Sequence, residues 1–402
     1  MKSEWTELPL GKIIDLVIDY RGKTPKKLGG DWSNTGYRAL SARNIKTGRI
    51  VQTDTIRYVD ESLYQKWMKD EVRRGDILIT SEAPFGQIFY WDSDEKIVLS
   101  QRLFCIRVNP KYDARFIYYY MTTSAFQGEL AGRSTGTTVI GLRQPELMKC
   151  IIHIPSGENQ HRIASILASI DAKISSNQKI NDNLYAQAKA TTKQWISQST
   201  GDYELLPLSD IALINPDTYS PKETWKYVNY LDTSSITEGC IAETQHITPS
   251  SEKLPSRARR KIAPNDIVFS TVRPNQRHYG IISEPLPNML GSTGFAVIRS
   301  KNPLVCNELI YLCLTENEFI EKMQQLAEQS TSTFPSIKPS DLGVCEIPCP
   351  KDQSSTSFTE TLKSLFALIA ANQRENISLS EIRDALLPKL MSGEIDVSDI
   401  QL

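Results

Sequence analysis

The sequence predicts an α+β fold in which two similar globular domains, arranged as a pseudo-two-fold repeat, are joined by two long helices that pair as an antiparallel coiled coil. Three observations predict this architecture. The helical stretch ISSNQKINDNL at 174–184 returns without a gap as IAANQRENISL at 369–379. Segments of the globular parts also recur in the same order. The 402 residues exceed what one hydrophobic core usually organises.

The repeats divide the chain into five segments. Each copy begins with a globular part and ends with one long helix, and the residues after the second helix are left as a tail. We predict a first globular domain at 1–157, a first spacer helix at 158–200, a second globular domain at 201–352, a second spacer helix at 353–391 and a tail at 392–402.

Matching segments identify the globular domains as copies of one design. RRGDILITS at 73–81 corresponds to APNDIVFST at 263–271. Short β-branched runs such as DILIT, RLFCIRV, DIVFS and GFAVIRS, bounded by Gly, Asn, Asp or Pro, predict strands. Helices are expected at 113–130 and 306–328. Strand and helix segments repeat while loop-bearing segments diverge, which is typical of one scaffold that carries two different binding surfaces.

Each long helix carries a heptad seam, in which apolar residues and two asparagines recur at alternating intervals of three and four. The first seam contains Ile163, Leu167, Ile170, Ile174, Asn177, Asn181, Leu184, Ala188 and Trp195. The second contains Leu362, Leu365, Ile369, Asn372, Asn376, Leu379, Arg383 and Leu386.

These seams predict that the two helices pair with each other, through Ile170 to Leu184 on one side and Leu365 to Leu379 on the other. A seam asparagine lowers stability but penalises wrong registers, because an unpaired buried amide is costly whereas two facing amides satisfy each other. The alternative is that each helix packs separately on its own domain.

Composition limits the classes of function. Lys plus Arg number 46 and Asp plus Glu number 47, so the formal net charge of -1 gives no global basic field. This counts against nucleic-acid binding without excluding local basic patches. The seven Cys and four His form no CxxC pair, so we expect reduced structural thiols and no metal site. With no apolar leader or membrane-length apolar run, a soluble cytoplasmic protein without membrane contact is expected.

The sequence contains no complete catalytic motif. RGKT at 21–24 resembles the end of a phosphate-binding loop, but Val17 stands where that motif needs Gly. NPDTY at 215–219 lacks the second Pro of the amino-methyltransferase motif and has no Gly-rich cofactor loop with it, so a loop between strands is expected. The four His are isolated from any HExxH or nucleophile-elbow context. We therefore predict neither catalytic residues nor a metal on this chain.

Several loops suit a polyanion. Arg matches guanine edges, Asn and Gln match adenine, and Lys or backbone N–H groups match phosphate. The stretches are RGKTPKK (21–27) and ALSARNIKTGR (39–49) in the first half, and SRARRK (256–261) and TVRPNQRHYG (271–280) in the second. SRARRK alone is more typical of a solvated face.

Ser/Thr-rich segments precede Arg143 and Lys338 at the same place in both halves, which favours a shared phosphate contact over ordinary turn and cap chemistry. The nucleic-acid-binding candidates are Arg21, Lys23, Lys26, Ser41, Arg43, Asn44, Arg133, Thr135, Thr137, Thr138, Arg143, Arg273, Asn275, Gln276, Arg277, Tyr279, Ser330, Thr331, Thr333 and Lys338.

Two segments carry a resemblance to a known family. IPSGENQHRIASILASIDAKISSNQKI at 154–180 is similar to the central conserved segment of type I restriction-modification specificity (S) subunits, and LLPKLMSGEIDV at 386–397 is similar to their C-terminal ending. The TGTT segment with its following leucines also fits that family. The resemblance covers essentially the whole chain, and the two-copy layout adds support.

The resemblance implies two target-recognition domains that each read one half of a split double-stranded DNA site, with the helix pair setting the gap. It implies two docked methyltransferase (M) subunits, restriction (R) subunits in the full complex, and a role in phage defence. It also implies no catalytic centre and no cofactor on this chain, with S-adenosylmethionine held by the methyltransferase.

The second half departs from the family pattern, because PCPKDQSSTSFTETLKSLF at 348–366 replaces the clearer ENQHRIASIL start. Contacts made there are therefore expected to differ between the copies. A different class of function also remains open, namely a non-catalytic coiled-coil scaffold whose two heads bind proteins. DNA reading predicts that Arg43→Ala or Arg273→Ala alters the methylated sequence, whereas the scaffold predicts no sequence-dependent effect.

Overall fold

The computed structural model describes residues 5–135, 140–198, 201–220, 222–330 and 334–400. Two compact units divide the chain: unit 1 comprises Met1–Ser175 and Asn376–Leu402, and unit 2 comprises Ser176–Glu375. Thr137, Thr138, Thr331 and Thr333 lie outside the described residues. The unit boundary cuts both long helices, so each unit holds part of both, and the five segments drawn from the sequence stay a prediction.

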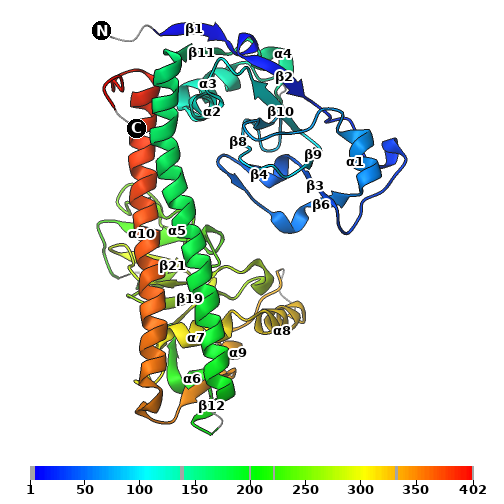
Figure 1. Cartoon of the computed structure of the whole chain (residues 1–402). Coiled ribbons are helices and arrows are strands. Elements are labelled where there is room, and N and C mark those ends of the chain that lie inside the picture. Colours follow the sequence, from blue (N-terminus) through cyan, green and yellow to red (C-terminus); the bar gives the residue numbers. More distant parts are fainter. Residues whose placement is uncertain (1–4, 136–139, 199–200, 221, 331–333, 401–402) are drawn as a thin grey trace. The chain divides into compact units, whose positions relative to one another are not determined.

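Unit 1 is built from small sheets and short helices beside its parts of the long helices (Figure 1). Its sheets are β1(Thr6–Pro9)–β11(Ile151–Ile154), β2(Ile14–Ile18)–β10(Leu103–Val108)–β7(Ile77–Thr80)–β8(Ile88–Tyr90), β6(Arg57–Val59)–β3(Tyr37–Leu40)–β9(Ile97–Leu99) and β4(Ile45–Lys46)–β5(Arg49–Ile50). Its short α-helices are α1(Glu61–Trp67), α2(Ala114–Thr122), α3(Ser124–Gly132) and α4(Gln144–Leu147).

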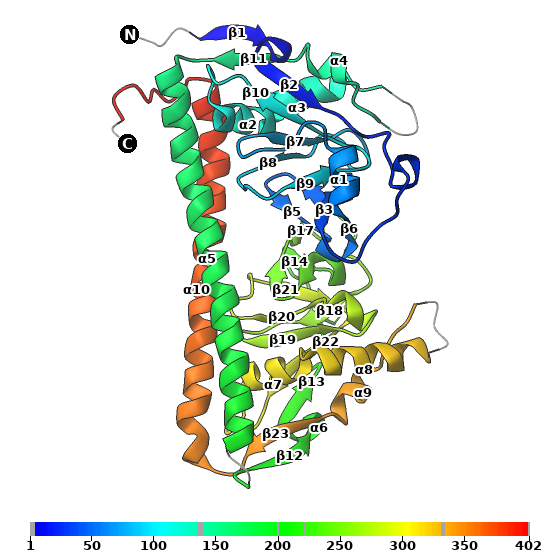
Figure 2. The same cartoon turned by 45° about the vertical axis from the view of Figure 1, so that its right-hand side comes forward.

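Unit 2 repeats this plan (Figure 2). Its sheets are β12(Tyr203–Pro207)–β23(Glu346–Pro350), β13(Ala212–Ile214)–β22(Phe295–Ser300)–β19(Asp266–Ser270)–β20(Tyr279–Ile282), β17(Gln245–Ile247)–β14(Val228–Leu231)–β21(Met289–Ser292)–β18(Ala258–Lys261) and β15(Ile236–Thr237)–β16(Cys240–Ile241). Its short α-helices are α6(Leu208–Ile211), α7(Asn307–Leu314), α8(Asn317–Glu328) and α9(Pro339–Gly343).

The two units share their strand order, sheet for sheet. Each has an antiparallel strand pair formed by the first and last strands, a four-stranded antiparallel sheet, a second sheet that contains one parallel pair, and a two-residue hairpin. Strand β18 is the addition in unit 2, where it lengthens the second sheet. The sequence prediction of one repeated α+β scaffold is therefore confirmed.

The strand runs are continuously apolar because both faces of the four-stranded sheet are buried. In β7, Ile77 and Ile79 enter one core while Leu78 enters another on the opposite face. In β19, Ile267 and Phe269 enter one core while Val268 enters another. Alternating side chains point to opposite faces of a strand, so a strand between two cores needs apolar residues at every position.

Each unit anchors this sheet with an ion pair between a buried aspartate and a partly buried arginine, at the start of its central strand. Asp76 pairs with Arg107 at 2.8 Å in unit 1, and Asp266 pairs with Arg299 at 2.7 Å in unit 2. Each carboxylate also accepts a backbone N–H three residues earlier in the chain. The aspartate of the repeated GD and ND turns therefore has the same role twice.

The helices expected at 113–130 and 306–328 are each two helices, so that prediction was wrong in both halves. The first is broken at Thr123, an extended residue whose hydroxyl accepts the Phe126 N–H and caps α3. The second is broken at Glu316, which is also extended and stands at the start of α8. The apolar periodicity continues through both breaks, which is why the sequence did not reveal them.

The long helices are α5(Gly157–Gln198) and α10(Thr356–Met391), and they pair in antiparallel fashion within each unit. In unit 2, Asn372 donates to Asn181 at 2.8 Å, and in unit 1 Arg383 donates to Asp171 at 2.9 Å. Lower numbers on α5 thus meet higher numbers on α10. All the predicted seam residues are buried or half-buried. The predicted pairing is confirmed, and the alternative of two separately packed helices is wrong.

The seam asparagines form hydrogen bonds across the helix pair, but they do not all pair with a facing asparagine as expected. Asn181 and Asn372 face each other, whereas Asn177 donates to Glu375 at 2.7 Å. Asn181 donates to the Ile369 carbonyl, and its repeat equivalent Asn376 donates to another backbone carbonyl in unit 1, at 3.4 Å in both cases. These bonds fix register in both units.

Candidate nucleic-acid interface

In unit 1, three loops meet at the carboxyl end of β7. The Ser81 N–H donates to the Arg102 carbonyl at 2.9 Å, and the Leu142 N–H donates to the Ser81 carbonyl at 2.9 Å. Arg143 follows at once and is exposed, at the residue before α4. Its guanidinium has no ion pair or side-chain hydrogen bond within the described parts of the chain.

Unit 2 repeats this loop frame at the carboxyl end of β19. The Thr271 N–H donates to the Gly294 carbonyl at 2.8 Å, and the Ile337 N–H donates to the Thr271 carbonyl at 2.9 Å. Lys338 follows, exposed, at the residue before α9. The same backbone contacts therefore place one exposed cation, Arg143 or Lys338, beside the carboxyl end of the central strand in each unit.

The loops after β7 and β19 share a backbone but not their side chains. Ala83 and Arg273 are both left-handed, with φ of 44° and 48°, and each precedes a proline. A non-glycine residue in this region is strained, and such strain gathers at functional sites. The first loop reads SEAPFG and is acidic and apolar, whereas the second reads TVRPNQ and carries hydrogen-bonding groups. Sequence reasoning missed residues 82–86, although the match of RRGDILITS to APNDIVFST pointed to them.

The second-domain candidates form a compact group on this loop. The Arg273 guanidinium lies over the Phe334 ring, 4.8 Å from its centroid. Asn275 and Gln276 are exposed, and their side chains have no hydrogen-bond partner among the residues that the structure describes. Arg277 is instead held by Glu238 at 3.1 Å and by Asn317 at 2.9 Å.

The prediction that Tyr279 contacts nucleic acid is corrected by its burial. Its side chain is 3% exposed and packs against the Phe269 and Tyr311 rings, so it belongs to the core rather than to a base-reading surface. Burial raises the pKa of its phenol to about 12. Tyr279 follows the loop as the first residue of β20, where alternation points it inward.

The prediction that Asn44 contacts nucleic acid is corrected in the same way. It is 1% exposed, and its amide is bonded to Ser41, to Thr55 and to the Gln52 carbonyl. Ser41 is half-buried as its capping partner. An amide that is fully committed inside a turn cannot also read a base edge.

The neighbouring hairpin β4–β5 and the short 3-10 helix before it, Ala42–Asn44, present a group of exposed cations. Arg43, Lys46 and Arg49 are all exposed, and none forms an ion pair within the described ranges. The Thr47 N–H donates to the Gln87 side chain at 3.0 Å, which ties the hairpin to the end of the β7–β8 loop. Lys46 and Arg49 were not among the candidates, although the quoted stretch ALSARNIKTGR contains them.

The RGKTPKK loop is mostly engaged internally. Arg21 pairs with Asp19 at 2.6 Å and lies 5.0 Å from the Phe104 ring centroid. Lys23 donates to a backbone carbonyl, and burial lowers the pKa of its ammonium. Lys26 is exposed. Of these three basic residues, Lys26 is the most accessible to a ligand.

The Ser/Thr-rich segments are described only in part. Arg133 pairs with Glu129 at 3.0 Å within one helical turn. Thr135 is exposed and forms a backbone bridge to Gly141. Ser330 donates its N–H to a carbonyl at the end of α8. The residues before Arg143 and Lys338 thus include ordinary turn and helix-end bonds.

The described residues contain no group of three or more His, Cys, Asp or Glu placed to hold a metal ion. None of the helices in the described ranges is long and apolar enough to cross a membrane.

Comparisons with known proteins agree with this architecture. Residues 2–186 match the family model described as "Type I restriction modification DNA specificity domain". The MjaIX type I restriction enzyme specificity subunit of Methanocaldococcus jannaschii is 24% identical over 350 residues, covering 81% of this chain and 79% of the relative. The HindI specificity subunit of Haemophilus influenzae is 29% identical over 133 residues, covering 33% and 29%.

A solved structure shows the same fold. The S subunit of a type I restriction-modification system from M. genitalium aligns with a TM-score of 0.55 at 18% identity, covering 96% of both chains. This likeness shows that the chain shares the fold of that S subunit. Residues 2–186 of this chain are thus similar to a type I restriction-modification DNA specificity domain, and most of the chain is similar to a type I specificity subunit.

Proposed function

We propose that the chain gives a type I restriction-modification complex its sequence specificity by reading a bipartite double-stranded DNA site, one half with each unit. The observation that carries this proposal is the duplicated loop frame. An exposed cation, Arg143 or Lys338, follows the same backbone contacts in both units, while the adjoining loops at 82–86 and 272–276 differ. A common phosphate contact beside different base-reading groups is what two half-sites of different sequence require.

The base-reading groups are assigned by accessibility and chemistry. In unit 2 they are Arg273, Asn275 and Gln276, because guanidinium and amide groups can form paired hydrogen bonds with guanine and adenine edges. In unit 1 they are Arg43 and the cations of the β4–β5 hairpin. Local groups of this kind also reconcile DNA binding with a net charge of -1.

The chemistry of the complex is assigned to other chains. Two methyltransferase subunits dock on this chain and hold S-adenosylmethionine, and restriction subunits complete the nuclease, while this chain itself is non-catalytic. The repeat of the helix pair supports two docking places of similar design. The antiparallel pair also acts as the ruler that sets the gap between half-sites.

The test is methylome sequencing of cells that express the chain with its methyltransferase, against cells with the methyltransferase alone. A split motif that depends on the chain is expected. Inserting one heptad, about 10 Å, into both α5 and α10 should lengthen the gap by roughly 3 base pairs. A stable complex with no new motif would instead support the protein scaffold, and an unchanged gap would contradict the ruler.

A further inference from the structure

Strand β18 of unit 2 carries a run of arginines. Arg257 comes just before the strand, and Arg259 and Arg260 lie within it. Arg257 is exposed, and the other two are half-buried. These three residues, the β18 arginines, form no ion pair or side-chain hydrogen bond with the part of the chain that the structure describes. Like charges at this spacing repel one another, so an anionic ligand between them would be favoured.

The carboxylates on the segment beside β18 already pair with other cations. The Lys261 N–H donates to the Asp217 carbonyl at 3.1 Å, so this segment borders the strand. The Asp217 carboxylate pairs with Arg299 at 3.2 Å. The Glu223 carboxylate pairs with Lys261 at 2.7 Å. Arg260 is left with a buried Nε atom that has no hydrogen-bond partner among the described residues, and burial lowers the pKa of its guanidinium. An anion bound to Arg260 would offset this cost.

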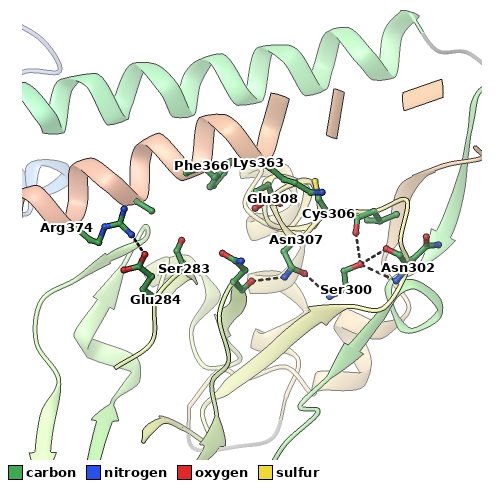
Figure 3. Close-up of a pocket in the computed structure, with 14 residues that line it drawn as sticks. Ser283, Glu284, Ser300, Asn302, Cys306, Asn307, Glu308, Lys363, Phe366 and Arg374 are labelled. Atoms are coloured by element: carbon green, nitrogen blue, oxygen red, sulfur yellow. Dashed lines mark hydrogen bonds and ion pairs between the residues drawn. The ribbon is translucent and has the colours of Figure 1, made fainter. Parts of the chain in front are cut away.

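Other cations of unit 2 are held by carboxylates. Lys363 and Arg374 line a cleft beside α10, which Figure 3 shows. Lys363 pairs with Glu360 at 2.8 Å, and Arg374 pairs with Glu284. The β18 arginines therefore differ from these surface cations, because no carboxylate is bonded to them.

The β18 arginines begin beside the loop frame of unit 2. The Thr293 N–H donates to the Arg257 carbonyl at 2.8 Å. The next carbonyl along the chain, that of Gly294, accepts the Thr271 N–H at 2.8 Å. Thr271 is the residue of the loop frame whose own carbonyl is bonded just before Lys338. The turn between β21 and β22 therefore joins Arg257 to the candidate nucleic-acid interface.

The equivalent turn of unit 1 is joined to a different cationic segment. There the Ser81 N–H donates to the Arg102 carbonyl, and the preceding carbonyl, that of Gln101, accepts the Ala42 N–H at 3.0 Å. Ala42 directly precedes Arg43, the first of the exposed cations in and before hairpin β4–β5. In both units this turn is thus bonded to a segment with several cations, but the segment is not the same one.

The matching hairpin of unit 2 lacks these cations. The stretch LSARNIKTGRI at 40–50 corresponds to LDTSSITEGCI at 231–241, and the two hairpins pair at matching positions. Uncharged residues replace the three cations, at Ser234, Thr237 and Cys240. The added strand of unit 2 therefore supplies, at the same turn, the positive charge that its hairpin does not carry.

We propose that the β18 arginines bind phosphate groups of the DNA backbone beside the half-site that unit 2 reads. Guanidinium groups form paired, charge-assisted hydrogen bonds with phosphate. The loop at 272–276 already carries hydrogen-bonding groups suited to base edges, so the contribution that unit 2 still needs is positive charge. The inference rests on the proposed function and adds to it a backbone contact on a strand that unit 1 does not have.

The experiment measures how tightly the assembled complex binds a DNA duplex that contains the split motif found by methylome sequencing, over a range of salt concentrations. Arg257→Gln with Arg259→Gln should raise the Kd by about 10-fold or more at about 0.15 M salt, and should reduce the salt slope by about 2. The methylated motif should stay the same, because phosphate contacts carry no sequence information.

Lys301→Gln with Lys351→Gln is the matched control, because it removes two exposed charges from the same unit. Lys301 follows β22 at the end of the sheet away from the loop frame, and Lys351 follows β23. The Kd should change by less than about threefold. A loss equal to that of the arginine variant would show that only the total charge matters, and would overturn the assignment to β18.

Arg260→Met separates binding from folding. It keeps an unbranched stem and removes a partly buried charge without a bonded partner, so the protein should resist denaturant at least as well as the wild type. The Kd for the duplex should nevertheless rise by about threefold or more. Lower resistance to denaturant with unchanged DNA binding would assign Arg260 a structural role and contradict its contact with phosphate.

Wild-type Kd and salt slope in both arginine variants would overturn this inference and leave the proposed function standing. A changed half-motif would show that the β18 arginines read bases, and loss of the methyltransferase from the complex in size-exclusion chromatography would show that they contact protein. Either result also overturns the inference. A wild-type complex that binds DNA without sequence preference would overturn the proposed function, and this inference with it.

Discussion

The two units use the same fold but hold the helix pair by different chemistry. In unit 1, Asp171 of α5 accepts from Arg383 of α10 at 2.9 Å and from the Tyr119 hydroxyl at 2.6 Å. By the alignment of the repeated helices, Phe366 and Ala188 hold the corresponding positions in unit 2. There both residues join an aromatic and aliphatic core.

The difference identifies which helices belong together. If α5 paired with a second α5 instead of α10, the same alignment would place Asp171 opposite an alanine, without a cation. An uncompensated partly buried charge is costly, so the polar cluster favours the pairing observed in unit 1. Phe366 and Ala188, the apolar equivalents in unit 2, stabilise the helix pair but do not favour α10 over a second α5 as the partner of α5. The repeated residues therefore form the common scaffold, and the residues that differ between the copies determine which helices pair.

The largest expected effect tests the part that the units share. Asp76→Ala and Asp266→Ala should each lower the free energy of unfolding by about 3–5 kcal/mol, because each removes the buried carboxylate that pairs with a partly buried arginine. The loss should be the smaller one for Asp266→Ala, because Arg299 keeps its ion pair with Asp217 at 3.2 Å. Chemical denaturation of the full chain measures the change. Glu360→Ala removes an exposed ion pair and should change it by less than about 1 kcal/mol. If only one of the two substitutions lowered the free energy of unfolding, the two ion pairs would not have equivalent roles in their units.

The next effect concerns the part that differs. Arg383→Ala should cost about 1–3 kcal/mol because it leaves Asp171 without its cation. The double variant Asp171→Leu with Arg383→Leu, which imitates the apolar design of unit 2, should return to within about 1 kcal/mol of wild type. The exposed pair of Arg374 provides the control, Arg374→Ala. Additive losses in the double variant would contradict the pairing argument.

A smaller effect compares the two shared cations. Arg143→Ala and Lys338→Ala should weaken DNA binding of the complex similarly for all sequences and reduce the salt slope by about 1 each, as expected for phosphate contacts. Lys12→Ala removes another exposed cation, outside both loop frames, and serves as the control. A change in the sequence bound would show that these residues read bases.

The smallest effect is expected at the seam of unit 2. Asn181→Leu with Asn372→Leu should change the free energy of unfolding by less than about 1 kcal/mol or raise it, since apolar seam residues pack well. The register should become less unique, which hydrogen exchange along both helices would detect as several opening rates. One uniform set of rates, as in wild type, would contradict the role given to these amides.

Much of the fold could be predicted from the sequence because its causes are local and repeated. The seam identified both long helices, and the doubled segments identified two scaffolds. The breaks at Thr123 and Glu316 could not be seen, because they interrupt the backbone while leaving the apolar period intact. The partner of Asn177 could not be seen either, since a small stagger between helices decides which side chain lies opposite.

The candidate site was predicted less well than the fold. Residue type suggested Asn44 and Tyr279, but burial removes both from the surface. Arg277 is held by Glu238, which lies far away in sequence. Accessibility depends on such distant neighbours, so a loop sequence alone does not distinguish Arg43, which is exposed, from the half-buried and engaged Arg21.

The most direct test of the central claim is methylome sequencing of cells expressing the methyltransferase with the wild-type chain, with Arg43→Ala or with Arg273→Ala. Each unit is proposed to read one half-site, so each substitution should relax one half of the split motif and leave the other half and the gap unchanged. Changes in both halves from a single substitution, or in neither half from both, would contradict the claim.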